Sequence, residues 1–436
     1  MPNDASIDLD VAVVGGGPAG ISACLELAGS PDLNVALFEG DRELGGMPRT
    51  CHVFFGMRDQ MRLLTGPAYA RRLKRLVEGT GCDIHRSARV LDIFPGKEGE
   101  PHGLRVLSPE GPRDYACRSL LLATGCFEGG RAERQIPGAR PAGVLTTGTL
   151  QQVVNQRDRR PGSRALIIGT ENVSFSSVLT LRRAGVSIVG MVEEGPELQT
   201  YPFAGLIGIP MGFPIFKGTT VGRILGDRRV EAVDLVRVAD GTARRVECDT
   251  VVMTGRFRPD SVLMDNTAIE FDPASRGPVV DMDFRTSVQN IFAAGNILRG
   301  ADMHDLCALE GRLAGRGIAR SLGSGGTAGQ RGIRIRGLPP IRYVVPQRLI
   351  PERIKRSLLS QLIPWPSFQV ERTLGLAVLE ARSGEALLWS GAFRRIIANT
   401  RIPLPVEKFD WDGVDAEKGI VLQIRSVHES SIHRRD

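Results

Sequence analysis

The chain has 436 residues, of which 42% are hydrophobic and 24% are charged, and its formal net charge at pH 7 is +7. This length and hydrophobic content predict two or three globular domains, which excludes a disordered or fibrous protein. Basic residues are spread along the chain and aromatic residues make up only 5%, so we expect no nucleic-acid-binding groove.

The predicted elements begin with two strand-helix-strand units. In the first, the strand Asp10–Val14 ends in glycines and is followed by a helical pattern over Pro18–Leu27 and the strand Val35–Phe38. A second unit of the same shape has the strand Arg164–Ile168, a helix near Val173–Ala184 and the strand Val186–Val192. Two such units predict an α/β protein with nucleotide-binding folds.

The rest of the chain contains a further strand and helix, a linker and a region of short apolar or alternating segments. The apolar strand Ile291–Ala294 precedes a helical stretch from about Asp305 to Ala319. The segment Leu322–Gly332, LGSGGTAGQRG, is typical of a linker. Short apolar or alternating runs then predict a small β-rich domain. These runs are Arg372–Leu379, Ala386–Trp389 and Ile420–Ile424.

The turn GGGPAG at Gly15–Gly20 lies between the first predicted strand and helix. In such a turn Gly15 permits the tight bend, Gly17 lets a pyrophosphate approach the backbone, and Gly20 lets the helix pack on the sheet. The diphosphate would lie at the helix N-terminus, where unpaired N–H groups favour an anion. Glu39, at the end of the next strand, would take the ribose hydroxyls of an adenosine. The pattern therefore predicts a dinucleotide site.

The segment Thr286–Asn296, TSVQNIFAAGN, identifies the family. It resembles the motif that holds the ribityl chain of FAD in flavoproteins with two dinucleotide-binding domains, the glutathione and thioredoxin reductase-like superfamily. That motif normally ends in Asp, whereas this chain has Asn296, whose amide still donates and accepts hydrogen bonds. Further similar segments are Gly45-Gly46 with Arg49, LLLATG at Leu120–Gly125 and VVMTGRFRP at Val251–Pro259.

This resemblance implies FAD as the cofactor and two Rossmann-like three-layer domains followed by a small β-rich domain. The FAD-binding domain is then discontinuous, with residues 1–150 and 256–322, and an NAD(P)-type domain with a degraded fingerprint is inserted at 151–255. Residues 323–332 form the linker and 333–436 the C-terminal domain. The residues implied to bind FAD are Gly15, Gly17, Pro18, Ala19, Gly20, Glu39, Gly46, Arg49, Val90, Thr124, Gly125, Gly295 and Asn296.

The second fingerprint departs from the superfamily pattern. It reads GTENVS at Gly169–Ser174 and puts Glu171 where a glycine normally admits the pyrophosphate. An inward-facing Glu171 would add bulk and a negative charge, so NAD(P)H binding is doubtful and electrons would enter from an organic substrate or a partner protein. If Glu171 turns to solvent, NADH still binds; an adenine nucleotide or an empty site are the other outcomes. The pair Glu193-Glu194, with no arginine, disfavours NADPH.

A narrower pattern is carried by GGMPRT at Gly45–Thr50, FGMRD at Phe55–Asp59, LTGPAYARRL at Leu64–Leu73 and ADMHDLCALEGR at Ala301–Arg312. It is similar to the FAD-containing larger subunits of heteromeric amine, imino-acid and opine dehydrogenases and of hydrogen cyanide synthase. The resemblance implies a small-molecule substrate, a second flavoprotein subunit and a small iron–sulfur protein, with electrons passing to a non-pyridine acceptor. Residues 333–436 contain no cysteine, so any cluster would lie on another chain.

Three residues are candidates for catalysis, namely His52, Arg49 and His304. His52 lies in a loop expected near the isoalloxazine and suits acid/base chemistry at neutral pH, although an ordinary loop histidine is an equal alternative. Arg49 and Arg58 would hold a substrate carboxylate or the flavin phosphates, or be surface charges. His304 and Asp305 begin a helix that should point at the flavin and stabilise negative charge there; Asp305 is otherwise an N-cap.

The seven cysteines include no C-x-x-C pair, so a redox dithiol, a zinc ribbon, an iron–sulfur loop and a metal site are not expected. We expect Cys51 and Cys307 to stay unlinked. With no signal peptide, the predicted location is cytoplasmic. No transmembrane helix is predicted, since Phe203–Phe216 is too short to span a bilayer. That stretch and Ile363–Phe368 are core edges or partner interfaces.

Two other functions stay open at this stage. The chain could be an NAD(P)H-dependent flavoprotein reductase that uses its second domain despite Glu171. It could also be an FAD-containing structural or assembly subunit without catalysis of its own.

Overall fold

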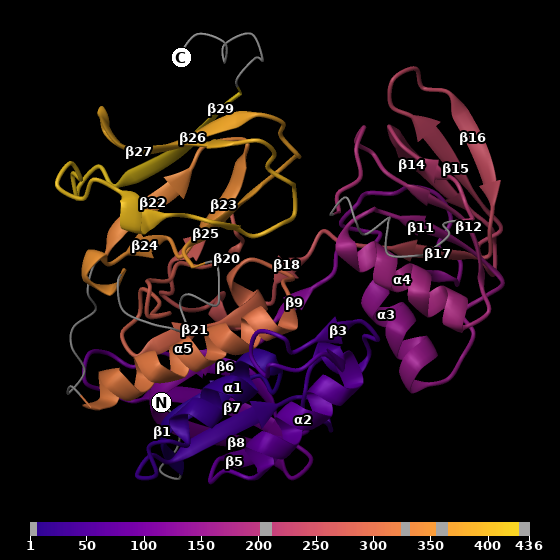
Figure 1. Cartoon of the computed structure of the whole chain (residues 1–436). Helices are drawn as coiled ribbons and strands as arrows, with labels where there is room; N and C mark the ends of the chain where they lie inside the picture. The colour runs from indigo at the N-terminus through magenta and orange to yellow at the C-terminus, as the bar shows by residue number, and fades with distance from the viewer. Residues whose placement is uncertain (1–6, 201–211, 324–331, 355–364, 427–436) are drawn as a thin grey trace.

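The computed structural model describes residues 7–200, 212–323, 332–354 and 365–426 (Figure 1). Its first domain contains a seven-stranded sheet in the order β5-β2-β1-β8-β7-β6, with β21 beside β8. The parallel strands are β5 (Asp83–Arg86), β2 (Val35–Glu39), β1 (Ile7–Val14), β8 (Gly111–Leu122) and β21 (Ile291–Ala293). The strands β6 (Arg89–Phe94) and β7 (His102–Ser108) continue the sheet from β8 as an antiparallel meander.

Three helices belong to this domain, α1 (Pro18–Leu27), α2 (Gly66–Glu78) and α5 (His304–Gly323). Val11, Ala12 and Val13 of β1 are all fully buried, as expected for a parallel strand covered on both faces. Helix α5 packs directly on α1, because a Cβ on Gly311 would lie only 2.0 Å from the carbonyl oxygen of Ala19. A hairpin of β3 (Phe54–Phe55) and β4 (Leu64–Thr65) precedes α2.

The second domain repeats this architecture. Its parallel sheet has the order β10 (Val144–Thr146), β17 (Thr250–Met253), β11 (Arg164–Ile168), β12 (Ser187–Val192) and β13 (Ile215–Phe216). The helices are α3 (Thr147–Gln151), which continues as a π-helical turn over Gln152–Gln156, and α4 (Asn172–Arg183). An antiparallel meander follows, with β14 (Thr219–Leu225), β15 (Ala232–Arg237) and β16 (Ala243–Glu247).

Two short strands connect the domains. β9 (Cys126–Phe127) leads into the second domain and pairs antiparallel with β18 (Arg258–Pro259), which leads back (Figure 1). The returning chain forms the small β19 (Phe271–Asp272) and β20 (Gly277–Pro278) ladder before β21. Short 3-10 helices lie at Met47–Arg49, Val262–Met264, Gly295–Leu298, Pro351–Arg353 and Val406–Lys408.

The C-terminal domain consists of two sheets that lie above the first domain in Figure 1. One has the order β24 (Arg348–Leu349), β22 (Ile333–Gly337), β29 (Ile420–Ser426), β26 (Ala377–Ser383) and β27 (Ala386–Phe393). The other has β23 (Ile341–Val345), β25 (Ser367–Val370) and β28 (Ile402–Pro403). The predicted fold class, two Rossmann-like domains and a β-rich C-terminal domain, is confirmed.

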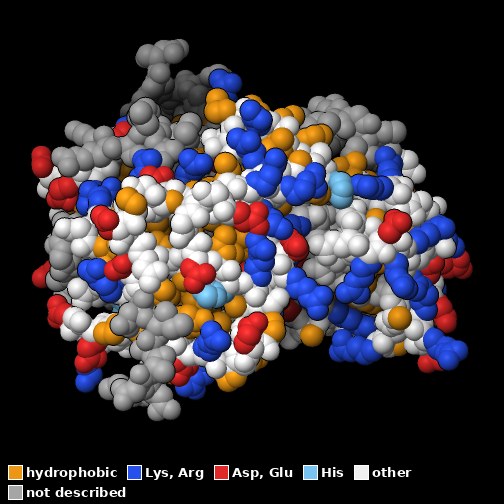
Figure 2. Space-filling model, turned by 90° about the horizontal axis from the view of Figure 1, so that it is seen from below, with side chains coloured by type: hydrophobic (Ala, Val, Ile, Leu, Met, Phe, Trp, Pro, Cys, Tyr) orange, Lys and Arg blue, Asp and Glu red, His pale blue; other side chains and the backbone are white. Residues whose placement is uncertain are grey.

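The sequence predicts that the apolar stretches Phe203–Phe216 and Ile363–Phe368 are either edges of the core or partner interfaces. Trp365 is only 9% exposed and stacks on Phe284 with ring centroids 4.6 Å apart, and Phe368 is fully buried, so this part of Ile363–Phe368 is core. Residues 203–211 of the other stretch, Phe203–Phe216, lie outside the described residues, as do 363–364. Within the described parts of the chain, no helix has the length and apolar character needed to cross a membrane. Seen from below, basic side chains are densest on the side of the second domain (Figure 2).

Candidate functional site

The glycine turn after β1 is tight on one side and open on the other. Gly15 has a φ of +110°, and a Cβ there would lie 2.4 Å from the Ala123 carbonyl oxygen, so a larger residue does not fit. A Cβ on Gly20 would lie 1.9 Å from the Gly15 carbonyl oxygen. A Cβ on Gly17 would meet nothing within 4 Å. Because Gly17 is the N-cap of α1, the open space lies at the end of the helix that attracts anions.

Glu39, the residue predicted to bind the ribose hydroxyls, is the last residue of β2. Its Oε2 accepts the Gly16 N–H at 2.9 Å and its Oε1 accepts the Asp41 N–H at 2.7 Å. Burial raises the pKa of Glu39, and these two N–H donors oppose the rise. The N–H of Ala88 donates to the Glu39 carbonyl at 2.9 Å, which brings the strand of the buried Val90 beside the end of β2.

The second glycine pair closes over the first turn. Gly46 has a φ of +58°, and a Cβ there would lie 3.1 Å from the Cα of Gly17. Arg49 donates through Nε to the Gly46 carbonyl at 3.1 Å and forms an ion pair with Asp41. The structure therefore places the Arg49 guanidinium beside the phosphate turn, which favours the phosphate role over the substrate role.

The segments that leave the two domains are tied together. The Thr124 hydroxyl donates to the Asp260 carbonyl at 2.7 Å, and the Asp260 N–H donates to the Gly125 carbonyl at 3.0 Å. Gly125 has a φ of +86° at this crossing. Thr124 and Gly125 thus lie at the carboxyl end of β8, beside the connection between the domains.

The ribityl motif meets the start of α1. Gly295 has a φ of +82°, and a Cβ there would lie 2.8 Å from the Cβ of Ala19. The Oδ1 of Asn296 accepts the Asp302 N–H at 2.9 Å and the Cys307 thiol at 3.0 Å. The Asn296 amide is therefore held in place by the first turn of α5 and the loop before it.

These residues fit FAD. Gly17, Thr124 and Gly295 follow β1, β8 and β21, and Glu39 is the last residue of β2. These residues therefore meet at the carboxyl edge of one parallel sheet, where such sheets bind ligands. The turn offers open space for a diphosphate, Glu39 offers carboxylate oxygens for a ribose, and Asn296 offers an amide for a polyol chain.

Sequence reasoning missed Glu310, which is fully buried on α5 and accepts the Gly295 N–H at 3.2 Å. A charged residue on the buried stripe of the predicted helix was the available signal.

His52 lies where the first domain meets the second. Its Nδ1 is buried and has no hydrogen-bond partner among the described residues. Burial and the nearby Arg183 of α4 lower the pKa of His52, so its imidazole is neutral at pH 7 and able to accept a proton. The carbonyl of Thr50 in the same loop accepts the side-chain amide of Asn155 at 2.6 Å.

His304 and Asp305 lie in the first turn of α5. The His304 ring packs on Phe55 at 4.6 Å, and burial lowers the pKa of His304 to about 4, so it carries no charge at pH 7. The helix begins at His304, so Asp305 is not its N-cap. Asp305 instead pairs with Arg58 at 3.4 Å, which makes Arg58 part of this network and not an isolated surface charge.

The glycine turn of the second domain is filled by its own side chain. The Oε2 of Glu171 accepts the hydroxyls of Ser174 and Thr254, both at 3.0 Å. A Cβ on Gly169 would lie 2.5 Å from this oxygen, and a Cβ on Gly255 would lie 2.3 Å from Oε1. The Glu171 carboxylate therefore faces inward and occupies the space above both glycines. Glu171 is also the N-cap residue of α4. Burial raises its pKa.

The adenosine end of this domain is also occupied. Glu193 follows β12 and is only 2% exposed. Its Oε1 accepts the Gly195 N–H at 2.9 Å and the Gln199 amide at 3.0 Å, and its Oε2 accepts the Thr170 hydroxyl. Both carboxylate oxygens of Glu193 are therefore committed to the protein.

The cysteines near the flavin segments are single thiols. All seven are free, and burial raises the pKa of both Cys51 and Cys307, which keeps them protonated at neutral pH. The described residues include no group of three or more His, Cys, Asp or Glu side chains that could hold a metal ion.

Comparisons with known proteins agree with this geometry. The profile of the family "Pyridine nucleotide-disulphide oxidoreductase" matches residues 9–311. Hydrogen cyanide synthase subunit HcnB of Pseudomonas protegens is 30% identical over 191 residues, which cover 43% of this chain and 39% of that protein. HcnB of Pseudomonas aeruginosa is 27% identical over 293 residues, covering 61% and 60%. Both matches span less than two thirds of the HcnB length. Thioredoxin reductase of Lactococcus lactis has a TM-score of 0.61 at 20% identity, covering 72% of this chain and 99% of that one.

Proposed function

Because this chain belongs to the pyridine nucleotide-disulphide oxidoreductase family and is an FAD-dependent oxidoreductase, we propose a specific role for it within a larger enzyme. It is the FAD-carrying subunit of a heteromeric dehydrogenase that oxidises an amino acid, an imino acid or a related small acid. Electrons leave to an acceptor other than a pyridine nucleotide. The similarity to a subunit of hydrogen cyanide synthase supports this assignment to a multi-subunit dehydrogenase.

One observation carries the proposal, namely the Glu171 carboxylate inside the second glycine turn. A bound NADH would have to bring its diphosphate to the N-terminus of α4, where this carboxylate already accepts the Ser174 and Thr254 hydroxyls. Two like charges in a poorly solvated site repel strongly. The usual electron donor of such a fold is therefore disfavoured, and a reduced organic substrate or a partner protein takes its place.

FAD, when bound, supplies a two-electron acceptor that also passes electrons singly. Gly17, Glu39, Arg49 and Asn296 would hold it at the edge of the first sheet. His52 is suited to receive the proton released when a substrate C–N bond is dehydrogenated, since its imidazole is neutral and its buried Nδ1 is unpaired. The protonated, single thiols at Cys51 and Cys307 do not support disulfide chemistry.

The test is anaerobic stopped-flow on the chain purified with the proteins encoded beside its gene. Loss of visible flavin absorbance is followed after mixing with amino acids, opines, NADH or NADPH. We expect one of the organic acids to bleach the flavin and NADH to leave it oxidised. Rapid bleaching by NADH would contradict the proposal and favour a flavoprotein reductase.

A further measurement separates catalysis from a purely structural role. Replacing His52 with Asn should lower the rate of flavin reduction by the organic substrate about 100-fold, while the FAD content stays the same. An unchanged rate in the assembled complex would indicate an assembly subunit whose FAD serves folding.

A further inference from the structure

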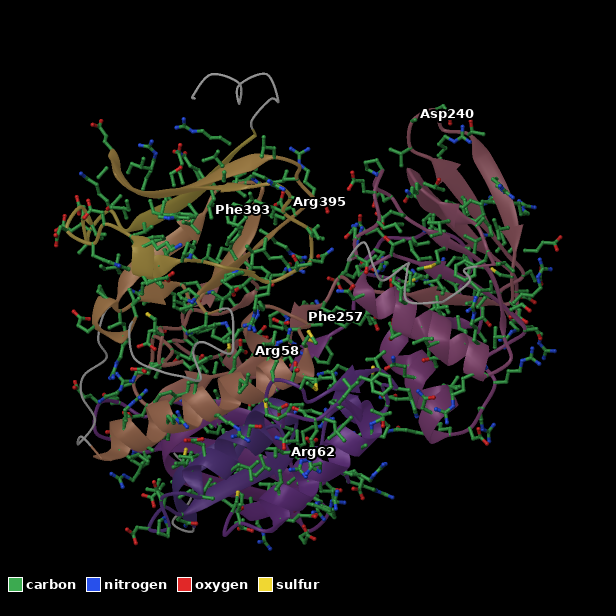
Figure 3. The ribbon with its side chains drawn as sticks, viewed as in Figure 1. Arg58, Arg62, Asp240, Phe257, Phe393 and Arg395 are labelled. Atoms are coloured by element: carbon green, nitrogen blue, oxygen red, sulfur yellow. The ribbon has the colours of Figure 1, made fainter. Side chains whose placement is uncertain are left out.

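One segment of the C-terminal domain, residues 395–401, reaches both nucleotide-binding domains. At its start, Arg395 forms an ion pair with Glu197 of the second domain at 3.1 Å, and the Asn399 amide donates to Gln199 at 2.5 Å. Figure 3 shows Arg395 on the side of the C-terminal domain that faces the second domain. The Arg395 and Glu197 side chains are 49% and 60% exposed, so water screens this pair. The contact to the second domain is thus a surface contact.

At its other end the same segment enters the first domain. Arg401 is only 7% exposed and its Nη2 pairs with Glu310, which is fully buried on α5. Its Nε lies 3.0 Å from the Asp302 carboxylate. Arg299 completes the cluster, 2.5 Å from Glu310 and 3.3 Å from Asp302, so two guanidinium groups and two carboxylates share one enclosed space.

This cluster is in direct contact with the ribityl motif. The carboxylate of Glu310 that holds Arg401 through Oε1 accepts the Gly295 N–H through Oε2 at 3.2 Å. Asp302, the second partner of Arg401, donates its backbone N–H to the Asn296 side chain at 2.9 Å. Gly295 is therefore bonded to a carboxylate that pairs with Arg401, and Asn296 is bonded to the backbone N–H of a residue whose carboxylate pairs with Arg401.

Arg401 affects this cluster through its charge as well as through packing, because it neutralises buried carboxylates. Removing one partner from a buried ion cluster leaves an unpaired charge, which the structure relieves by moving or by taking up a proton. Without Arg401, Glu310 keeps only Arg299 as a cationic partner and becomes easier to protonate. A protonated Glu310 is a weaker acceptor for the Gly295 N–H.

We propose that Arg401 is a positioning residue of the FAD site, by which the C-terminal domain fixes the Gly295–Asn296 segment through Glu310 and Asp302. The inference is independent of the substrate and of the electron acceptor. It gives the C-terminal domain a role in cofactor retention, exerted through one buried side chain.

The experiment uses the full chain, stripped of flavin and titrated with FAD. Arg401→Gln should weaken FAD binding about 10-fold or more and alter the visible circular dichroism of the bound flavin. Arg401→Lys keeps the charge and should recover part of both, so it serves as the conservative variant and as the fallback if the Gln variant is unfolded. Arg395→Gln, an exposed arginine of the same segment, is the matched control and should bind FAD within 2-fold of the wild type.

The pH dependence of FAD affinity distinguishes a lost charge from lost packing, because loss of packing alone would not change it. Burial raises the pKa of Glu310 to about 7 and Arg299 opposes that rise; Asp302, Tyr343 and Cys307 also face this space. In Arg401→Gln the pKa of Glu310 rises further, so FAD affinity should fall as the pH drops from 9 to 6, more steeply than in the wild type. Wild-type FAD affinity and spectrum in a folded Arg401→Gln protein would overturn the proposal. Equal losses in the Arg401 and Arg395 variants would overturn it as well.

Discussion

Both glycine-rich turns of this chain follow a buried parallel strand and supply the N-cap of the next helix, Gly17 for α1 and Glu171 for α4. Above Gly17 there is open space, whereas above Gly169 and Gly255 lies the carboxylate of Glu171. The end of a helix that attracts an anion is thus left free for a ligand in one domain and is occupied by a side chain in the other.

The adenosine ends of the two domains differ in the same direction. Each carboxylate oxygen of Glu39 and of Glu193 accepts a hydrogen bond from the protein. Glu39 is half-buried and accepts two backbone N–H groups, whereas Glu193 is only 2% exposed and also accepts the side chains of Thr170 and Gln199. The comparison teaches that a nucleotide fold keeps its backbone when side chains replace the contacts of the nucleotide.

The largest effect is expected when a glutamate is placed in the first glycine turn. Gly17→Glu should fold, because Gly17 has a φ of −82° and a Cβ there meets nothing within 4 Å. We expect FAD binding to weaken about 1,000-fold or more, ~4 kcal/mol, since the new carboxylate would face the diphosphate. Flavin content after purification and the dissociation constant of FAD measure the effect. Gly17→Ala is the matched control and should cost less than about 10-fold; equal losses in both variants would mean that bulk, not charge, decides.

The reverse exchange should open the second turn. Glu171→Gly removes the carboxylate above Gly169 and Gly255, and we expect NADH binding to strengthen at least about 10-fold by calorimetry. Glu171→Gln separates charge from bulk, because its amide still reaches Ser174 and Thr254; we expect it to remain a poor NADH binder. Wild-type protein that binds NADH as tightly as the Glu171→Gly variant would contradict the assignment of this residue.

A smaller effect is expected at the adenosine end of the first domain. Glu39→Gln keeps the size of the side chain and loses the charge, so FAD should bind about 10-fold more weakly, ~1.4 kcal/mol. Fluorescence titration of the flavin-stripped protein gives the number. Glu43→Gln is the control, since Glu43 pairs with Lys74 on the surface. An unchanged FAD affinity in the Glu39 variant would show that Glu39 does not contribute to binding of the ribose.

Much of this comparison could be predicted from the sequence, because glycine spacing and apolar strands are local signals. The turn at Gly15–Gly20, Glu39 and the misfit of Glu171 were all visible in the order of residues. The direction of the Glu171 side chain was not, since it depends on hydroxyls of Ser174 and of Thr254, which is 83 positions away. The contact of Arg401 with Glu310 spans 91 positions and left no local pattern.

Long-range packing also sets charges and ion pairs that the local sequence does not show. The helix N-terminus at His304 stays a predicted stabiliser of negative charge on the flavin, but the His304 ring itself lies on Phe55 and burial keeps it neutral. Arg58 was left as a ligand contact or a surface charge, and the structure pairs it with Asp305, 247 positions away. Titration behaviour depends on neighbours that only the fold brings together.

The smallest expected effect concerns stability and pH at the closed turn. Burial raises the pKa of Glu171, so the folded protein takes up a proton there more readily than the unfolded chain does. Above that raised pKa the buried charge costs stability, and as the pH falls through it the cost is relieved. The melting temperature of Glu171→Gln should therefore exceed that of the wild type most at pH 8, and the difference should shrink toward pH 4.

Thermal unfolding at a series of pH values tests this, with Glu194→Gln as the control. Glu194 follows Glu193 in the chain and its side chain is 65% exposed, so its replacement should shift the melting temperature little and evenly across the series. If the advantage of Glu171→Gln grew as the pH fell, the wild-type carboxylate would be stabilised as a charge in the turn. It would then act as a well-solvated or well-paired anion, and the E171Q variant would lose an ionic contact, not relieve a buried charge.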